Sequence, residues 1–273
     1  VPGGSRVISI TGTNGKSTVT ALAGAMCRSA GMDCEVAGNI SPAALEALRL
    51  RRESGVDPEA WVLELSSFQL ETTDTLDANA AVMLNISEDH LDRYASLQEY
   101  AAAKARVFRG HGIQVLNRDD AWSMSMRLPG RRTLTFGLDA PRLEDDFGLI
   151  RFEGKPWLAQ GSSRLMPVSA MRLAGLHNAS NALAALALCR AIGLPMAPLL
   201  AALKEFRGLP HRVEFVGELP VGADSCASAI RFYDDSKGTN VGSTIAALDG
   251  LAGAESDGSR IVLIAGGAVS YTH

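Results

Sequence analysis

The sequence has few cysteines, and none forms a pair with the spacing of a metal or redox motif. The four are Cys27, Cys34, Cys189 and Cys226, and no histidine lies at zinc-finger spacing. Reduced thiols of a cytoplasmic protein are therefore favoured over a disulfide framework. No apolar run reaches the ~18 residues of a membrane span, and the polar start VPGGSR has no signal-peptide pattern. We expect a cytoplasmic protein that does not enter a membrane.

Positive charge is not concentrated in any segment. The chain has 26 Lys and Arg against 30 Asp and Glu, for a net charge of −4. A nucleic-acid partner would require a basic stripe, so we expect none, and we expect a monomer. Hydrophobic residues make up 47% of the 273 positions, which is enough for a buried core and argues against disorder.

Apolar runs alternate with helical patterns along most of the chain. Continuous apolar runs predict strands at 6–10, 34–38, 61–66, 80–86, 113–117 and 132–137. Helical patterns follow Lys16 up to Gly31 and occupy 41–52, 97–108, 178–194 and 197–206. The second helix is expected to start with Ser41 as its cap and Pro42 in its first turn. This alternation predicts an α/β fold, a mostly parallel P-loop-type sheet with helices on both faces.

The residue pattern changes twice towards the C-terminus. Polar-apolar alternation over 148–173 predicts a small antiparallel addition to the sheet. RGLPHR suggests a domain boundary, and beyond it strands are expected at 213–219, 229–235 and 260–267, with a helix at 240–250. This is the start of a second, Rossmann-like domain, too short to be complete. We predict a nucleotide-binding domain at 1–208 and a truncated domain at 209–273.

The first candidate site is a glycine loop that lacks one glycine of the usual phosphate-binding pattern. Gly15, Lys16 and Ser17 end a Walker A motif whose first glycine would occupy position 10, where the chain has Ile10. A strand, a glycine turn and an immediate helix nevertheless place backbone N–H groups where they can bind phosphate oxygens. Lys16 would contact the β- and γ-phosphates and Ser17 would bind Mg²⁺. The alternative is an ordinary turn with a surface lysine.

Polar residues follow two of the apolar strands at the same predicted sheet edge. Glu64 ends one strand, and ligands of open α/β sheets collect at that edge, where a carboxylate can hold Mg²⁺. His90 follows another strand among Glu88, Asp89 and Asp92. The alternatives are a solvated glutamate and a structural histidine.

Three further segments have simple structural interpretations, and the last of them also has a functional one. From its spacing, Lys104 is a solvated helix lysine. Asn178 and Asn181 lie at a helix start, where asparagine commonly caps the helix. The loop YDDSKGTN at 233–240 precedes a helix and is either a capped turn or an anion site.

Taken together, these segments resemble the Mur ligase family of ATP-dependent amide-bond-forming enzymes. The shared features are GTNGKST, the strand-end glutamate, EDH, the helix lysine, HN-x-x-N and DSK-x-TN, in that order over residues 6–267. ELSSFQLE and NISEDHLDRY are most similar to the members that add D-glutamate. In this family the short loop TGTNGKST is complete, so Ile10 is expected to be the last buried residue of the strand.

The resemblance implies ATP and two Mg²⁺ ions as cofactors. The ATP phosphates would lie on the loop, with Lys16 on the γ-phosphate; the loop residues are Gly12, Thr13, Asn14, Gly15, Lys16, Ser17 and Thr18. Ser17 and Glu64 would hold one Mg²⁺, and His90 the second. Lys104 matches a lysine that CO₂ carbamylates in the family, and the resulting carboxylate helps to place the metal.

The remaining nucleotide contacts come from both sides of the predicted domain boundary. Asn178 and Asn181 would face adenine, while Arg212 and Asp235 would reach the ribose and the phosphates.

The resemblance also implies two substrates, UDP-N-acetylmuramoyl-L-alanine and D-glutamate. Asn39, Ser66 and His90 would lie near the muramoyl substrate, and Lys237 and Thr239 near the acyl phosphate and the incoming D-glutamate. Catalysis would depend on Lys16, His90, Lys104 and Lys237.

The implied reaction is a step of peptidoglycan precursor synthesis. The alanyl carboxylate is phosphorylated by ATP, and the amine of D-glutamate then displaces phosphate from the acyl phosphate. The family starts with a separate UDP-binding domain and continues beyond IAGG, where this chain ends in AVSYTH. We therefore expect a fragment that folds the central domain and ligates poorly or not at all. The alternatives are another Mur ligase, a folylpolyglutamate synthase, or a non-catalytic nucleotide-binding module.

Overall fold

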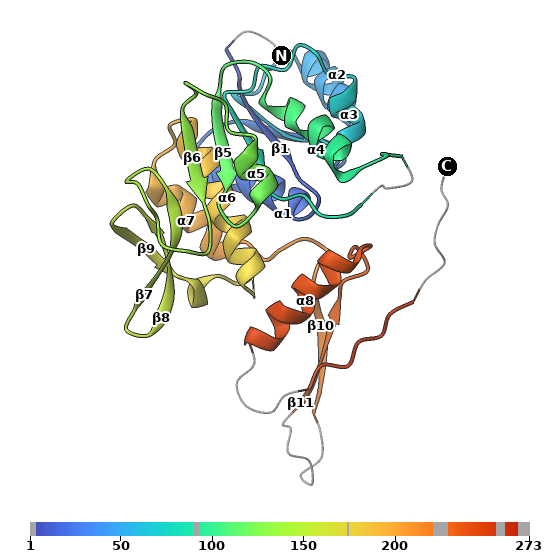
Figure 1. Cartoon of the computed structure of the whole chain (residues 1–273), viewed down its shortest axis with the longest axis vertical. Helices are drawn as coiled ribbons and strands as arrows, with labels where there is room; N and C mark the ends of the chain where they lie inside the picture. Colours follow the sequence, from blue (N-terminus) through green and yellow to red (C-terminus); the bar gives the residue numbers. More distant parts are fainter. Residues whose placement is uncertain (1–3, 90–92, 174, 221–228, 255–259, 267–273) are drawn as a thin grey trace.

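The protein is an α/β structure built on one nine-stranded sheet, followed by a smaller C-terminal unit (Figure 1). The computed structural model describes residues 4–89, 93–173, 175–220, 229–254 and 260–266. The strand order of the large sheet is β2-β3-β1-β4-β5-β6-β7-β8-β9. The predicted fold class is confirmed.

Six strands form the parallel part of the large sheet. They are β1 (Arg6–Thr11), β2 (Cys34–Gly38), β3 (Ala60–Glu64), β4 (Ala80–Met83), β5 (Ile113–Asn117) and β6 (Thr133–Phe136). Every residue of β3 and β4 is buried, as is all of β1 except Arg6. Continuous burial is typical of strands covered on both faces, and it explains why these runs are apolar throughout.

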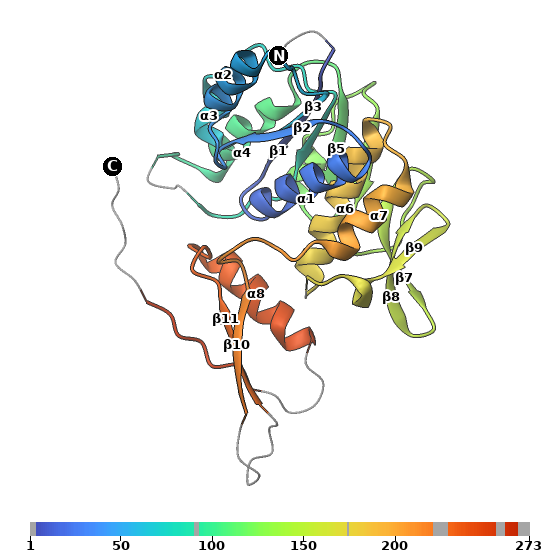
Figure 2. The same cartoon turned by 180° about the vertical axis from the view of Figure 1, so that it is seen from behind.

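Helices cover both faces of this sheet (Figures 1 and 2). One core joins Ile8 and Ile10 of β1 to the helices α1 (Lys16–Ser29), α6 (Leu176–Ala191) and α7 (Met196–Glu205). The other core joins Val7 and Trp61 to the elements on the opposite face. These are α2 (Ala44–Ser54), α3 (Ser67–Glu71), α4 (Leu97–Ala105), the 3₁₀ turn η1 (Arg106–Phe108) and α5 (Ala121–Ser125). Alternate residues of β1 thus supply two separate cores.

The antiparallel addition predicted for 148–173 is present at the end of the sheet. It consists of β7 (Phe147–Phe152), β8 (Lys155–Gln160) and β9 (Ser163–Pro167), followed by the 3₁₀ turn η2 (Val168–Ala170). β7 pairs in parallel with β6 and antiparallel with β8, so the addition continues the main sheet.

The C-terminal unit contains β10 (Glu214–Pro220), β11 (Ala229–Asp234) and α8 (Val241–Ala254). β10 and β11 form an antiparallel pair of their own. The unit meets the larger one where α8 approaches the start of α6, and Gly250 lies directly against His177. The division at 208/209 stays a prediction.

Three local predictions were wrong. Strand β1 continues through Thr11, which is fully buried, so Ile10 is not the last buried residue of the strand. Helix α2 begins at Ala44 without a side-chain cap, because the Pro42 carbonyl accepts a hydrogen bond from Gly38 and the preceding turn folds back onto β2. The described residues 260–266 form no strand: they pair with neither β10 nor β11, and Val262 and Ile264 are 84% and 93% exposed. An apolar run becomes a strand only when a partner satisfies its backbone groups.

Sequence periodicity missed the short helices α3 and α5, since five residues are too few to show a helical repeat. In the described part of the chain, no helix combines the length and the apolarity that crossing a membrane would require.

The packing of α6 yields a test of the first core. Leu183 is fully buried, whereas Leu45 of α2 is 81% exposed. We expect Leu183→Ala to lower the free energy of unfolding by roughly 2–5 kcal/mol, because it leaves a cavity under the sheet. The matched change Leu45→Ala should shift it by less than about 0.5 kcal/mol. Urea denaturation measures both, and similar losses in the two variants would contradict this assignment of the core.

Candidate functional site

The glycine loop joins the end of β1 to the start of α1. Gly15 precedes α1 with φ +85°, and a Cβ there would lie 2.5 Å from Oδ1 of Asn181. Glycine is therefore required both by the backbone conformation and by the space. No side chain caps the first turn of α1, so its N–H groups can receive an anion.

A strand-end asparagine holds the loop in place. Oδ1 of Asn85 accepts a hydrogen bond from the Asn14 N–H at 2.8 Å, and its Nδ2 donates to the Asn14 carbonyl at 3.1 Å. The Thr13 hydroxyl accepts one from the Ser87 N–H at 3.1 Å. Sequence reasoning missed Asn85, although it stands in the polar cluster after the β4 run.

Lys16 lies over the loop that precedes it. Its Nζ donates to the Thr13 carbonyl at 2.8 Å. Burial lowers the pKa of Lys16, while Glu64 and Asp89 oppose that shift and Arg212 adds to it. The side chain is thus placed where a phosphate bound to the loop could replace the carbonyl as its partner.

Lys104 is buried, although its spacing in α4 is that of a solvated lysine. It is 1% exposed, and its Nζ donates to the Gly12 carbonyl at 2.8 Å and lies 4.8 Å from the centre of the Tyr100 ring. Burial, and then the charge of Lys16, hold the pKa of Lys104 well below its usual range, against the attraction of Asp89 and Glu64. The amine therefore has a larger neutral fraction than a surface lysine.

Glu64 offers a buried carboxylate oxygen that fits a cation. It is 2% exposed at the end of β3, and its Oε1 accepts a hydrogen bond from Nδ2 of Asn39 at 2.9 Å. Among the described residues, its buried Oε2 has no hydrogen-bond partner. A buried carboxylate oxygen left in this way is costly unless a cation or water meets it, and a hard divalent cation fits an oxygen ligand.

A pocket opens beside the loop, between the start of α6 and the C-terminal unit. Its volume is about 80 Å³ and it is partly open to solvent, so in this conformation it is smaller than typical small-molecule sites. The four residues expected to contact adenine, ribose and phosphate all line it: Asn178, Asn181, Arg212 and Asp235. Asn14, Gly15 and Thr18 of the loop complete one wall.

The far wall of this pocket contains two titratable groups. Burial lowers the pKa of His177, partly offset by Asp235. Burial also raises the pKa of Asp235, against the charges of Arg212 and His177. His177 was not predicted to be a site residue, although it precedes Asn178 in HN-x-x-N and lines the same pocket.

The other expected site residues lie outside this pocket. Asn39 is exposed and reaches Glu64, and Ser66 caps α3 in a reciprocal pair with Gln69. Lys237 and Thr239 are exposed and do not line the pocket. His90 lies outside the described residues.

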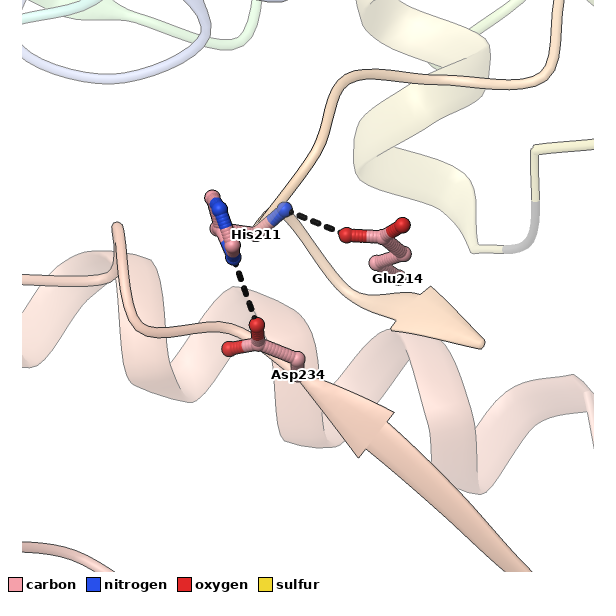
Figure 3. A group of neighbouring side chains, drawn as sticks. All are labelled: His211, Glu214 and Asp234. Carbon is pink, nitrogen blue, oxygen red and sulfur yellow. Dashed lines mark hydrogen bonds and ion pairs between the residues drawn. The ribbon is translucent and has the colours of Figure 1, made fainter. Parts of the chain in front are cut away.

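A second cluster of charged side chains lies at the start of the C-terminal unit (Figure 3). His211, Glu214 and Asp234 offer ligand atoms within 4.8 Å of one another, the one such metal-compatible group among the described residues. Both carboxylates already accept hydrogen bonds, Glu214 from the His211 N–H and Asp234 from the His211 ring, each at 2.7 Å. Both carboxylates of the cluster are thus already engaged by His211. Sequence reasoning did not single it out.

The Mur ligase middle domain model matches residues 10–189. That segment includes the loop, Glu64, Lys104 and both pocket asparagines. The chain belongs to the Mur ligase family. The family resemblance seen in the sequence is confirmed.

The sequence relatives carry a more specific name. The chain is 58% identical over 264 residues to UDP-N-acetylmuramoylalanine--D-glutamate ligase of Nitrosospira multiformis, covering 96% of this chain and 53% of the relative. The enzyme of that name from Nitrosomonas eutropha is 54% identical, with coverages of 97% and 54%. The chain thus spans about half the length of the curated relatives it matches.

Solved structures of Mur ligases share the fold. A UDP-N-acetylmuramoyl-L-alanyl-D-glutamate--2,6-diaminopimelate ligase is 27% identical with a TM-score of 0.63, covering 78% of this chain and 48% of that one. MurF from Acinetobacter baumannii is 22% identical with a TM-score of 0.69, with coverages of 89% and 53%.

The buried phenol below the loop makes a pH-dependent prediction. Tyr100 is 1% exposed, and burial raises its pKa to about 12. The unfolded chain ionises first, at about pH 10, so this residue removes stability at roughly 1.4 kcal/mol per pH unit between the two pKa values. Tyr100→Phe should therefore lose less stability than the wild type between pH 10 and 11.5.

Denaturant unfolding at a series of pH values measures this slope. Tyr233→Phe is the control, because Tyr233 is exposed on β11. Parallel slopes for Tyr100→Phe and the wild type would contradict the burial effect.

Proposed function

We propose that this chain is the nucleotide-binding part of a ligase that adds D-glutamate to UDP-N-acetylmuramoyl-L-alanine at the expense of ATP. The single observation that carries the proposal is the arrangement around the loop. Lys16, Lys104 and the unsatisfied Glu64 oxygen come from α1, α4 and β3, and the charges of these groups influence one another. A nucleotide phosphate and a cation would satisfy all three.

ATP would occupy the loop and the adjoining pocket. The N–H groups at the start of α1 and the Lys16 ammonium would bind its phosphates. Asn178 and Asn181 offer amide groups that can hydrogen-bond to an adenine edge. Arg212 would complete the phosphate end, since its Nη2 lies 3.5 Å from the Ser17 hydroxyl.

The donor set below the loop fits Mg²⁺. Glu64 and Ser17 would hold it, with His90 at a second ion, and Mg²⁺ would neutralise charge on the transferred phosphoryl group. A neutral Lys104 amine can add to CO₂, forming a carbamate and releasing one proton. The lowered pKa of Lys104 favours the neutral amine that this step requires.

The chain's own residues would then promote two displacements. Lys16 would balance the charge that develops as the alanyl carboxylate attacks the γ-phosphate in line. Lys237 and Thr239 would meet the acyl phosphate and the D-glutamate amine after the C-terminal unit moves, because both are exposed and outside the pocket in this conformation. No protein nucleophile is needed.

Several finer expectations stay predictions. These are the second Mg²⁺ ion, carbamylation of Lys104, the monomeric state and the cytoplasmic location. Impaired ligation by this chain also stays a prediction. A non-catalytic nucleotide-binding module is the competing function.

Nucleotide binding is the first test. Lys16→Met should weaken MgATP binding at least tenfold, because it removes a charge-assisted contact worth roughly 1.5–3 kcal/mol. Lys155→Met on β8 is the matched control, since Lys155 is exposed and far along the sheet order from the loop. Titration calorimetry measures the MgATP affinity of both variants. Equal affinities would refute the proposal that the loop binds the ATP phosphates.

Turnover separates the two candidate functions. Phosphate release is measured with MgATP and UDP-N-acetylmuramoyl-L-alanine, with and without D-glutamate. Dependence on D-glutamate at any rate supports the ligase, whereas binding or hydrolysis that ignores D-glutamate supports the nucleotide-binding module. D-glutamate-dependent release at the rate of a full-length relative would contradict the predicted impairment.

A further inference from the structure

The linker before β10 holds Arg212 between two residues in an unusual backbone conformation. His211 has φ +63° and Val213 has φ +49°. The left-handed region is unfavourable for any residue with a Cβ, and more so for β-branched valine. Such a conformation persists only when surrounding contacts hold it.

The cluster in Figure 3 supplies the contacts on the His211 side. The His211 ring pairs with Oδ2 of Asp234 at 2.7 Å, and the His211 N–H donates to Oε2 of Glu214 at 2.7 Å. The His211 side chain, followed by the backbone and side chain of Ser236, lowers the pKa of Asp234 to about 2. Asp234 is therefore an anion throughout the neutral range.

The backbone on both sides of Arg212 makes further hydrogen bonds. The Val213 N–H donates to Oδ1 of Asp235 at 3.1 Å, and the Lys237 N–H donates to the His211 carbonyl at 3.1 Å. The backbone on both sides of Arg212 is thus attached to the end of β11 and to the turn that follows it.

This anchoring decides where the arginine side chain goes. Arg212 is half-buried and lines the pocket, with its Nη2 3.5 Å from the Ser17 hydroxyl across the boundary between the two units. A linker that relaxed to an ordinary conformation would redirect this side chain, because the Cα–Cβ direction follows the backbone dihedrals.

We propose that His211, Asp234 and Glu214 are positioning residues that hold the linker in its left-handed conformation and so direct Arg212 to the phosphate end of the pocket. The inference rests on the proposed function in one respect: the effect of holding Arg212 in place is measured as nucleotide affinity. The conformation of the linker itself can be tested without nucleotide.

A double-mutant cycle tests the coupling to Arg212. MgADP affinity is measured by calorimetry for Arg212→Ala, His211→Ala and the double variant. Each single change should weaken binding about tenfold, and the double variant should bind like Arg212→Ala, because His211 acts through Arg212. Independent, additive losses would overturn the proposal.

The matched control is a second His–Asp pair on the surface. The His111 ring lies 3.3 Å from Oδ2 of Asp77, far in sequence from the linker. His111→Ala should leave MgADP affinity unchanged. A loss in this variant equal to that of His211→Ala would show a general charge effect and would also overturn the proposal.

Trypsin provides the measurement that needs no nucleotide. It cleaves after Arg212 only when the linker can leave its present conformation, so cleavage there should be slow in the wild type. His211→Ala and Asp234→Ala should raise the rate about tenfold, as expected for loss of a charged hydrogen bond, with mass spectrometry identifying the site. His111→Ala should not change it. Unchanged cleavage in both linker variants would overturn the proposal, whether or not the protein binds nucleotide.

A conservative variant covers the case in which Asp234→Ala does not fold, which thermal unfolding reveals. Asp234→Asn keeps an oxygen that can accept from the Ser236 N–H, which donates to Oδ1 of Asp234 at 2.9 Å in the wild type, and it loses only the charge. It should raise cleavage less than His211→Ala does. Cleavage as slow as in the wild type would show that the charged pair holds nothing. Absence of MgADP binding by the wild type, with the expected cleavage pattern, would refute the proposed function alone.

Discussion

The site depends on the hydrogen bond between a buried lysine and the glycine loop above it. Lys104 donates to the Gly12 carbonyl from below, and its charge is isolated from water at a position close to Lys16. Two neighbouring cations in a buried region are unfavourable, so the neutral amine of Lys104 is favoured unless anions approach. The carboxylate of Glu64 supplies part of that compensation, and a phosphate with its cation would supply the rest. The hydrogen bonds therefore hold the loop in place, whereas the positive charge beside it is only partly balanced.

The sheet places these groups by its topology. β1 lies between β3 and β4, so the loop after β1, Glu64 at the end of β3 and Asn85 after β4 meet at one edge. Because the three strands are parallel, residues separated by more than seventy positions become neighbours at their carboxyl ends. The same arrangement places α6 beside the loop, where Asn181 fills the space that a side chain at position 15 would need.

The C-terminal unit contributes to this site across a narrow set of contacts. Asn240 caps the first turn of α8 through the Ser243 N–H and donates to Asn14 of the loop at 3.2 Å. Arg212 reaches Ser17 from the linker, and Gly250 packs on His177. A pocket formed between two units in this way can change its shape when one unit moves, which is a common property of enzymes that close around a nucleotide.

The sequence by itself determined the fold class, the loop and the family, because these depend on local patterns: apolar runs covered on both faces, a glycine turn before a helix, and motifs in a fixed order. It could not determine the burial of Lys104, whose helical spacing is that of a surface residue, nor the absence of a strand in the described residues 260–266. It also gave no sign that His211 and Val213 are left-handed. Each of these depends on which distant segments come into contact, and only the tertiary structure decides that.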